Sequence, residues 1–448
     1  MKKFFGTDGM RAVAGEYPLD KKTILTLAKA LVELLEQEGL EPRVLIGRDT
    51  RESGPWIEET LFQGIRAGEG EAVFAGVIPT SAVSFLTKKH RFSAGIVISA
   101  SHNPYRDNGI KIFSPQGLKI SDEWEAKLEK AMASGKDNPK INRLTISPEP
   151  GLSKDYEDFL KGQLEGLPRL KNLNLVVDCS NGASSAIAPE VFRELGFKVM
   201  AIHNRPDGKN INRRCGSLHP EELVRKVLAA GADLGVAYDG DADRAIWVDE
   251  NGRILNGDHT LFVEARHMKE KRRLKSTKIV ATTMSNMGLE QALEKMGLEL
   301  VRTKVGDKYV LEKMMESGSN LGGEQSGHTI FLDDCPTGDG ILTSLRMLEV
   351  MLSQRASLSE LTSELKEFPQ VLLNVRVREK PDFSRFPEII QVMDDVKKEL
   401  AGRGRLDVRY SGTEPLARVM VEAREKAMVQ ALAKRMAETI AKYLGEGE

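Results

Sequence analysis

The stretch SAGIVISASHNP, residues 93–104, shows the pattern from which the fold of this chain can be inferred. Its first part is a run of apolar and small residues typical of a buried strand, and it continues directly into a polar turn. The stretch LGVAYDG, residues 234–240, continues in the same way into a group of aspartates. Segments with a helical spacing of apolar residues, such as 20–39, separate these strands. This alternation predicts βαβ units with largely parallel sheets, in which ligands bind at the strand ends.

The chain divides into four blocks, and its 448 residues suit about three domains at about 150 residues each, or four if they are small. The first three blocks alternate strands with helices, whereas the block after residue 366 has neighbouring strands and a basic C-terminal helix. We therefore expect an α/β fold with three similar α/β domains, whose sheets are mixed but mostly parallel, and a C-terminal α+β domain. A polar stretch at 133–150 is the expected linker after the first domain. The expected domains are 1–150, 151–254, 255–366 and 367–448.

Composition narrows the class of protein. Hydrophobic residues are 40% and charged residues 29%, which is typical of a soluble globular chain. The net charge of -1 argues against nucleic acid or an anionic membrane as the main partner. No stretch reaches the ~18 apolar residues of a membrane span. The cysteines are few and far apart, which indicates reduced thiols in a cytoplasmic protein and neither a disulfide framework nor a zinc site. They are Cys179, Cys215 and Cys335.

Two loops carry candidate chemistry directly after strands. Ser101, before His102-Asn103-Pro104, could project its hydroxyl into a cleft, although a plain turn explains the motif as well. The loop DGDADR, residues 239–244, contains three aspartates at alternate positions, which repel one another unless a cation holds them. Carboxylate oxygens suit Mg²⁺ or Ca²⁺, and the flanking strands exclude an EF-hand. The alternative is a solvated acidic loop.

Two further loops could bind a hydroxylated or phosphorylated ligand. GGEQSGH, residues 322–328, places Glu, Ser and His between glycines, or it is a glycine-rich turn with a structural histidine. RYSGTEP, residues 409–415, combines an arginine with two hydroxyls around a glycine, which suits a phosphate, or it is a turn between strands. The motifs FGTDGMR (5–11) and GRDTR (47–51) are weaker, since surface charge explains each one alone. The chain has no Walker A sequence and no G-x-S-x-G elbow.

Taken together, the motifs ASHNP, DGDADR, GEQSGH and RYSGTEP resemble the α-D-phosphohexomutase superfamily, in the family's order and over essentially the whole chain. The resemblance implies four domains around a central cleft, each contributing one loop. It implies that Ser101 is carried as phosphoserine and binds one Mg²⁺ per subunit together with Asp239, Asp241 and Asp243. It places four further residues in the active site: Arg11, Lys111, Arg244 and His328. It assigns substrate binding to Glu324, Ser326, Arg409, Ser411, Gly412, Thr413 and Arg418.

The motifs FGTDGMR, PDGKNIN, CGSLHPE and SGTEPLARVMVE resemble the subgroup that acts on glucosamine phosphates. This implies isomerisation of glucosamine 6-phosphate to glucosamine 1-phosphate through a phosphoserine and a bound hexosamine or hexose 1,6-bisphosphate, feeding UDP-N-acetylglucosamine synthesis. The expected partner is a small sugar phosphate, and a homodimer is compatible with the resemblance. Three alternatives stay open: a mutase for neutral hexose phosphates, a sugar-phosphate sensor without turnover, and a metal-dependent phosphatase. Lys111 is expected to handle a proton, with a pKa lowered by neighbouring cations.

Overall fold

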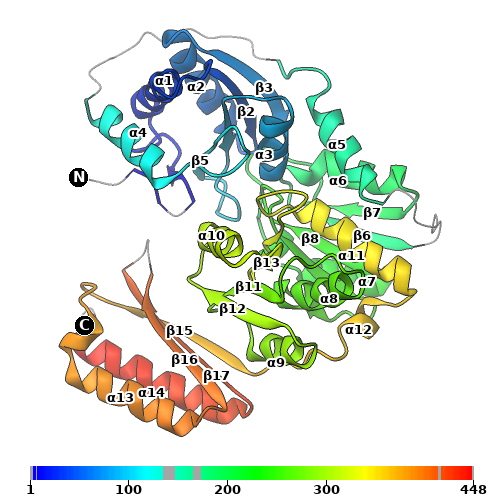
Figure 1. The fold of residues 1–448 in the computed structure, drawn as a ribbon, viewed down its shortest axis with the longest axis vertical. Coiled ribbons are helices and arrows are strands. Elements are labelled where there is room, and N and C mark those ends of the chain that lie inside the picture. Colours follow the sequence, from blue (N-terminus) through cyan, green and yellow to red (C-terminus); the bar gives the residue numbers. More distant parts are fainter. Residues whose placement is uncertain (1–3, 7, 135–146, 165–172, 412–414, 446–448) are drawn as a thin grey trace. The chain divides into compact units, whose positions relative to one another are not determined.

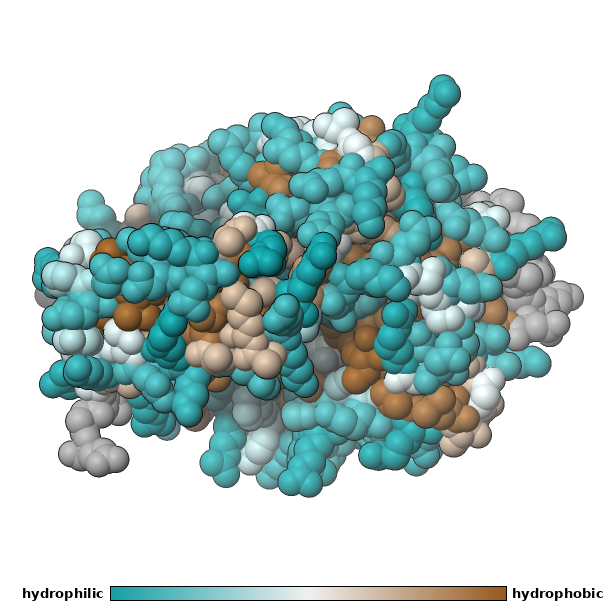
Figure 2. All heavy atoms as spheres, turned by 90° about the horizontal axis from the view of Figure 1, so that it is seen from below, coloured by the Kyte–Doolittle hydropathy of each residue, from teal (hydrophilic) through white to brown (hydrophobic). Residues whose placement is uncertain are grey.

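The computed structural model describes residues 4–6, 8–134, 147–164, 173–411 and 415–445. The chain folds into two compact units, one of residues 1–282 and 301–363 and the other of residues 283–300 and 364–448. The expected linker at 133–150 falls mostly outside the described residues. No helix of the described part is long and apolar enough to cross a membrane. The face in Figure 2 is mainly hydrophilic, with apolar side chains in small groups.

The first sheet has the strand order β1-β5-β4-β2-β3, and Figure 1 labels its strands β2, β3 and β5. Strand β2 pairs in parallel with β3 and β4, whereas β5 runs antiparallel to β4 and β1. Every residue of β4 is buried, which explains the uninterrupted apolar run in the sequence. The strands are Met10–Val13 (β1), Arg43–Arg48 (β2), Glu71–Val77 (β3), Ala94–Ile98 (β4) and Asp107–Phe113 (β5). The helices are Lys21–Gln37 (α1), Gly54–Ala67 (α2), Thr80–Lys89 (α3) and Asp122–Ser134 (α4).

The second sheet repeats this arrangement with the order β10-β9-β8-β6-β7. Strand β6 pairs in parallel with β7 and β8, and β9 is antiparallel to β8. Its strands are Asn174–Asp178 (β6), Lys198–Ile202 (β7), Leu234–Tyr238 (β8), Ala245–Asp249 (β9) and Ile254–Leu255 (β10). The helices are Leu152–Gly162 (α5), Ser184–Glu194 (α6) and Glu221–Ala230 (α7), with a 3₁₀ turn at Gly216–Leu218.

The third sheet has the order β12-β11-β13-β14, with β11 parallel to β13 and β13 antiparallel to β14. Three sheets therefore share one plan, and in each the last two strands form an antiparallel pair. The strands are Lys278–Thr282 (β11), Glu299–Thr303 (β12), Leu321–Gly323 (β13) and Thr329–Phe331 (β14). The helices are Gly257–Glu270 (α8), Met287–Lys295 (α9), Asp307–Ser317 (α10), Gly340–Gln354 (α11) and Leu358–Leu361 (α12).

The last sheet is antiparallel throughout, with the order β15-β17-β16 and both neighbours paired to β17. Helices α13 and α14 share its apolar core, which includes Val396, Val419 and Met436. The strands are Gln370–Arg376 (β15), Gly404–Tyr410 (β16) and Leu416–Ala423 (β17), and the helices are Pro387–Leu400 (α13) and Lys426–Leu444 (α14). The expectation of three similar α/β domains with mixed sheets and a final α+β domain is confirmed.

Candidate active site at equivalent strand ends

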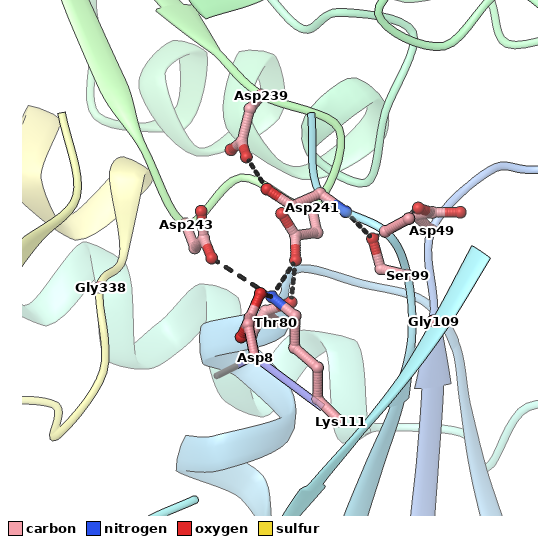
Figure 3. A network of polar contacts seen from close by, with 12 residues as sticks. Asp8, Asp49, Thr80, Ser99, Gly109, Lys111, Asp239, Asp241, Asp243 and Gly338 are labelled. Carbon is pink, nitrogen blue, oxygen red and sulfur yellow. Dashed lines mark hydrogen bonds and ion pairs between the residues drawn. The ribbon is translucent and has the colours of Figure 1, made fainter. Parts of the chain in front are cut away.

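Ser101 lies in the turn between β4 and β5. The strand ends at Ile98, three residues earlier than the predicted run, because the chain there turns toward its polar contacts. Ser101 has a left-handed backbone with φ of 51° and a buried side chain. Its hydroxyl donates a hydrogen bond to Asp239 Oδ2 at 2.5 Å, and its backbone N–H donates to Ser99 Oγ at 2.9 Å. Figure 3 labels these two partners, Asp239 and Ser99. The serine hydroxyl therefore faces the aspartate loop.

Arg51 holds the serine loop in place. Its guanidinium is fully buried and donates to five oxygen atoms. One is Asp49 Oδ2, and the other four are backbone carbonyls of the loop: those of Ser101, Asn103, Pro104 and Asp107. On the other side, Asn212 Nδ2 donates to the carbonyl oxygens of Ser101 and Asn103 at 2.8 and 3.1 Å. These bonds fix the backbone on which the serine hydroxyl is presented.

The three aspartates lie in the turn between β8 and β9, the equivalent position in the second sheet. All three are buried, and one carboxylate oxygen of each lies within 4.8 Å of the others. A Cβ on Gly240, between the first two, would lie 2.5 Å from the Ser101 carbonyl oxygen, so only glycine allows this close approach of the two loops. The sequence motif thus folds into the compact acidic group that its spacing suggested.

The acidic group fits a hard divalent cation. Burial, together with the charges of Asp243 and Asp241, raises the pKa of Asp239 well above its usual range. Among the described residues, Asp241 Oδ1 and Asp243 Oδ1 are buried without a hydrogen-bond partner. Three converging carboxylates with free oxygen lone pairs are the donor set that Mg²⁺ or Ca²⁺ prefers.

Lys111 reaches the same group from β5. Its Nζ lies 2.9 Å from Asp241 Oδ2, 3.5 Å from Asp243 Oδ2 and 3.2 Å from Asp8 Oδ2. Burial lowers the pKa of Lys111, but the three carboxylates outweigh it and hold the pKa well above its usual value. The expectation of a pKa lowered by neighbouring cations is therefore wrong for this structure, because the carboxylates lie closer. Thr80 Oγ1, at the start of α3, also donates to Asp241 Oδ2 at 2.6 Å.

Two arginines border the group. Arg11, on β1, pairs with Asp8, and its Nη1 donates to the Ala100 carbonyl oxygen at 3.4 Å. Arg244 Nε lies 3.8 Å from Asp243 Oδ1 and has no hydrogen-bond partner in the described part of the chain. Both guanidinium groups can therefore offer N–H donors to an anion beside Ser101.

The loop GEQSGH is the turn between β13 and β14, again the equivalent position. Its backbone pairs with the aspartate loop, through a bridge between Arg244 and His328 and a hydrogen bond from Ala245 N to the Gly327 carbonyl oxygen at 3.1 Å. Glu324 Oε1 accepts from Gly306 N at 3.0 Å, and Ser326 Oγ donates to Glu324 Oε2 at 3.2 Å. Glu324 and Ser326 are thus held together beside the aspartate group.

His328 is buried in a defined orientation. The Gly338 N–H donates to its Nε2 at 3.2 Å, so Nε2 is the acceptor and Nδ1 carries the proton of the neutral ring. A Cβ on Gly338 would lie 2.4 Å from Nε2, so glycine is required there. Nδ1 is buried and has no hydrogen-bond partner among the residues described. His328 therefore has one N–H left for a ligand.

Sequence reasoning missed a bridge on the opposite side of Lys111. Lys119 Nζ pairs with both Asp8 and Asp307, and Asp307 Oδ2 lies 3.8 Å from His328 Nε2. Lys119, Asp307 and His328 line a cavity of about 200 Å³ whose other walls include Leu311. Lys119 and Asp307 belong to none of the four motifs, whereas Asp8 is part of FGTDGMR. Lys119 and Asp307 are recognised as site residues only through their contacts with residues far away in the sequence.

The RYSGTEP loop joins β16 to β17 in the other compact unit. Arg409 and Arg418 are opposite each other in the ladder, and Arg418 Nη2 donates to Ser411 Oγ at 3.4 Å. Arg409 Nε pairs with Asp407 Oδ2 at 3.0 Å, and Lys380 Nζ donates to the Ser411 carbonyl oxygen at 2.7 Å. Three predicted phosphate-binding residues therefore lie together. The other two, Gly412 and Thr413, lie outside the described residues.

Comparison with known proteins matches the four domain models of the phosphoglucomutase/phosphomannomutase family. Residues 2–139 match its α/β/α domain I, 154–252 its domain II, 256–368 its domain III and 372–439 its C-terminal domain. A phosphoglucosamine mutase of Koribacter versatilis is 47% identical over 441 residues, which cover 95% of this chain and 94% of the relative. That of Caldicellulosiruptor bescii is 45% identical over 431 residues, 95% of this chain and 96% of the relative.

Solved structures share the fold. A phosphoglucomutase/phosphomannomutase family protein of Burkholderia thailandensis is 24% identical, has a TM-score of 0.80, and is matched over 98% of this chain and 97% of its own. An Aspergillus fumigatus N-acetylphosphoglucosamine mutase, solved with GlcNAc-6P and magnesium, has a TM-score of 0.68 at 18% identity, over 98% of this chain and 95% of its own.

Proposed function

The chain belongs to the phosphoglucomutase/phosphomannomutase family, and we propose that it interconverts glucosamine 6-phosphate and glucosamine 1-phosphate. Relatives that are 44–47% identical over nearly the whole chain are phosphoglucosamine mutases, which supports the amino sugar. The observation that carries the proposal is the buried Ser101 hydroxyl on Asp239, inside a group of three aspartates. A serine so placed can carry a phosphoryl group between two oxygens of one sugar.

The proposed reaction has two transfers. In the first, the O1 hydroxyl of glucosamine 6-phosphate attacks the phosphorus of phosphorylated Ser101; the bond from phosphorus to Oγ breaks and a bond to O1 forms. The product is a bound 1,6-bisphosphate. After the sugar turns end for end, Ser101 Oγ attacks the other phosphorus, and O6 leaves with a proton. The total number of phosphoryl groups is unchanged, so no nucleotide is consumed.

We assign the metal site to Asp239, Asp241, Asp243 and the phosphorylated Ser101 oxygen, with one Mg²⁺ per chain. The bound cation would offset the negative charge of the phosphoryl group. It would also offset the charge of the carboxylates that raise the pKa of Lys111 in the absence of a cation. Lys111 is then the group that accepts or returns the sugar hydroxyl proton. Arg11 and Arg244 stabilise the charge on the transferred group, and His328 donates its Nδ1–H.

The remaining predicted residues would orient the substrate. Glu324 and Ser326 bind sugar hydroxyls, and the pair can serve both orientations of the ring. Arg409, Ser411 and Arg418, with Gly412 and Thr413, hold the phosphate that is not being transferred. The proposal includes a hexosamine 1,6-bisphosphate as intermediate and activator. The product of the reaction, glucosamine 1-phosphate, would feed UDP-N-acetylglucosamine synthesis. A homodimer in the cytoplasm is the proposed assembly.

The phosphoryl carrier is tested by Ser101→Ala, with Ser326→Ala as the matched control. We expect Ser101→Ala to abolish conversion of glucosamine 6-phosphate while the circular dichroism spectrum is unchanged. Intact mass should show one phosphate on the wild type and on Ser326→Ala, and none on Ser101→Ala. Ser326→Ala should chiefly raise KM. Near-normal turnover by Ser101→Ala would contradict the proposal.

A further inference from the structure

A second group of metal-ligating side chains lies in the second sheet's domain, beside the ends of β6 and β7. Asp178 ends β6, His203 follows β7, and Cys215 precedes the 3₁₀ turn at 216–218. One ligand atom of each lies within 4.8 Å of the other two. His203 Nδ1 is 3.0 Å from Asp178 Oδ2. Three separate segments therefore bring a carboxylate, an imidazole and a thiol to one point.

The donor set differs in kind from the three aspartates. A thiolate and an imidazole are ligands for a borderline cation such as Zn²⁺, whereas Mg²⁺ binds oxygen. Carboxylate oxygens complete such sites at similar distances. The wide separation of Cys215 from the other cysteines argued against zinc in the sequence, but here the other ligands are an aspartate and a histidine from distant segments.

His203 has a carboxylate beside its second ring nitrogen, as histidines that bind a metal usually do. Glu222 Oε2, on α7, lies 3.3 Å from His203 Nε2, so a carboxylate can accept the Nε2 proton. Metal-binding histidines usually donate their second ring N–H in this way, which leaves the other nitrogen free to coordinate. His203 Nδ1 lies 3.0 Å from Asp178 Oδ2, and the contacts with Asp178 and Glu222 raise the pKa of the imidazole, so a cation bound here would replace the ring proton beside Asp178.

The surroundings can admit a cation, and the positive charge of Arg213 compensates the thiol only in part. Asp178 and Cys215 are buried, whereas the His203 side chain is 21% exposed, so an ion can enter on the histidine side. Burial, with the charges of Asp178 and Glu222, raises the pKa of Cys215 to about 12. A cation among these groups would reverse that effect, because a bound thiol is deprotonated.

We propose that Asp178, His203 and Cys215 form a second cation site, separate from the three-aspartate group, which takes a borderline divalent ion such as Zn²⁺ or Co²⁺. The ion would join the two ends of the segment 203–215. That segment carries Asn212, which donates to the carbonyl oxygens of Ser101 and Asn103. Occupancy would thus stabilise the support of the serine loop.

The test uses the full chain, freed of metal with a chelator and kept in saturating Mg²⁺ so that the three aspartates are occupied. It is then titrated with Co²⁺ alone. We expect one equivalent to bind with a sulfur-to-cobalt charge-transfer band in the near ultraviolet. Cys215→Ser should lose this band, whereas Cys335→Ser, which changes another buried free cysteine, should keep it.

Two further variants keep the test valid if Cys215→Ser does not fold. His203→Gln and Glu222→Gln alter partly exposed side chains, and each should weaken Co²⁺ binding at least about tenfold. Zn²⁺ should raise the unfolding midpoint of the wild type and of Cys335→Ser but not that of His203→Gln. No charge-transfer band in the wild type, a band that Cys335→Ser removes, or unchanged Co²⁺ affinity in both glutamine variants would overturn the proposal.

Discussion

A single buried arginine determines where the serine loop lies. Arg51 donates to five oxygen atoms, four of them backbone carbonyls around Ser101. A lysine offers one ammonium group and cannot reach this set, so Arg51→Lys should leave at least two buried acceptors unpaired. At ~1–3 kcal/mol each, the free energy of unfolding should fall by about 2–6 kcal/mol in urea titrations, and kcat should fall as well.

The matched control for Arg51→Lys is Arg48→Lys. Arg48 is partly exposed and pairs with Glu58 and with one carbonyl oxygen, so the same exchange should change the free energy of unfolding by less than about 1 kcal/mol. Equal effects of the two substitutions would contradict the special role of Arg51.

Substitutions of Lys111 can separate the effect of its positive charge from its role in proton transfer. Lys111→Met removes both, whereas Lys111→Arg keeps the positive charge beside Asp241 but cannot release a proton near neutral pH. If Lys111 moves the sugar hydroxyl proton, both variants should lower kcat about 10²–10⁴-fold with little change in KM. Steady-state kinetics with the exposed Lys89→Met as control would check this. Near-normal kcat in Lys111→Arg would assign the residue to charge stabilisation.

At the residue scale, the site residues that stand in motifs could be predicted from the sequence, but the residues that contact them could not. Ser101 and Asp239 stand in short motifs whose residue types already indicate chemistry. Arg51 looked like surface charge in GRDTR, because the carbonyls that bury it come from a loop about fifty residues later. Lys119 stands in no motif, and only its pairing with Asp8 and Asp307 reveals it.

At the scale of elements, helices α8 and α11 enclose a carboxyl group that gives a pH dependence. Glu264 is buried, and burial together with the charge of Glu349 raises its pKa from 4.5 to about 8. Between these values the folded chain holds a proton that the unfolded chain has released, so stability falls as pH rises. Glu264→Gln removes this loss, and its advantage over the wild type should grow by about 2 kcal/mol from pH 6 to pH 7.5.

Urea unfolding of wild type and variant at several pH values measures this difference. Glu270→Gln on the same helix is the control, because that side chain is exposed and should leave the pH profile unchanged. A constant difference between Glu264→Gln and the wild type across the range would show that Glu264 does not titrate there.

The strand-to-loop pattern and the similarity of three domains were readable in the sequence, but the strand order that the three sheets share was not. The loops with Ser101, Asp239 and Glu324 each connect an antiparallel pair at the equivalent place of a sheet: β4 to β5, β8 to β9 and β13 to β14. The three sheets share strand order without sharing sequence, because many apolar residues can fill a buried strand. Strand β13 has three residues, two of them glycine, too few to show a period.

For the whole molecule, the net charge of -1 does not reveal that charged side chains of both signs are concentrated at one site. Aspartates and basic side chains gather around Ser101, while the overall balance is neutral. Composition therefore argued against nucleic acid as a main partner but gave no sign of an anionic substrate. The boundaries at residues 150, 254 and 366 stay predictions, since polar linkers and turns mark a domain limit only loosely.

Preference for an amino sugar depends on the complete site, because the ring must be accepted in two orientations. Glu324 and Ser326 can bind hydroxyls that glucose, mannose and glucosamine share. Gln325, a candidate for reading the amino group, donates its side-chain amide to Asp258 at 3.4 Å. Asp307 is better placed, since it lines the cavity beside His328 and its carboxylate suits an ammonium group.

We therefore expect kcat/KM for glucosamine 6-phosphate to exceed that for glucose 6-phosphate at least about tenfold, which corresponds to ~1.4 kcal/mol. Some activity on neutral sugars should remain, because hydroxyl and phosphate contacts are shared. Asp307→Asn should reduce the preference by lowering kcat/KM mainly for the amino sugar, whereas Asp122→Asn, at an exposed position on the same cavity, should not. If glucose 6-phosphate or mannose 6-phosphate proves an equal or better substrate, the chain is a mutase for neutral hexose phosphates.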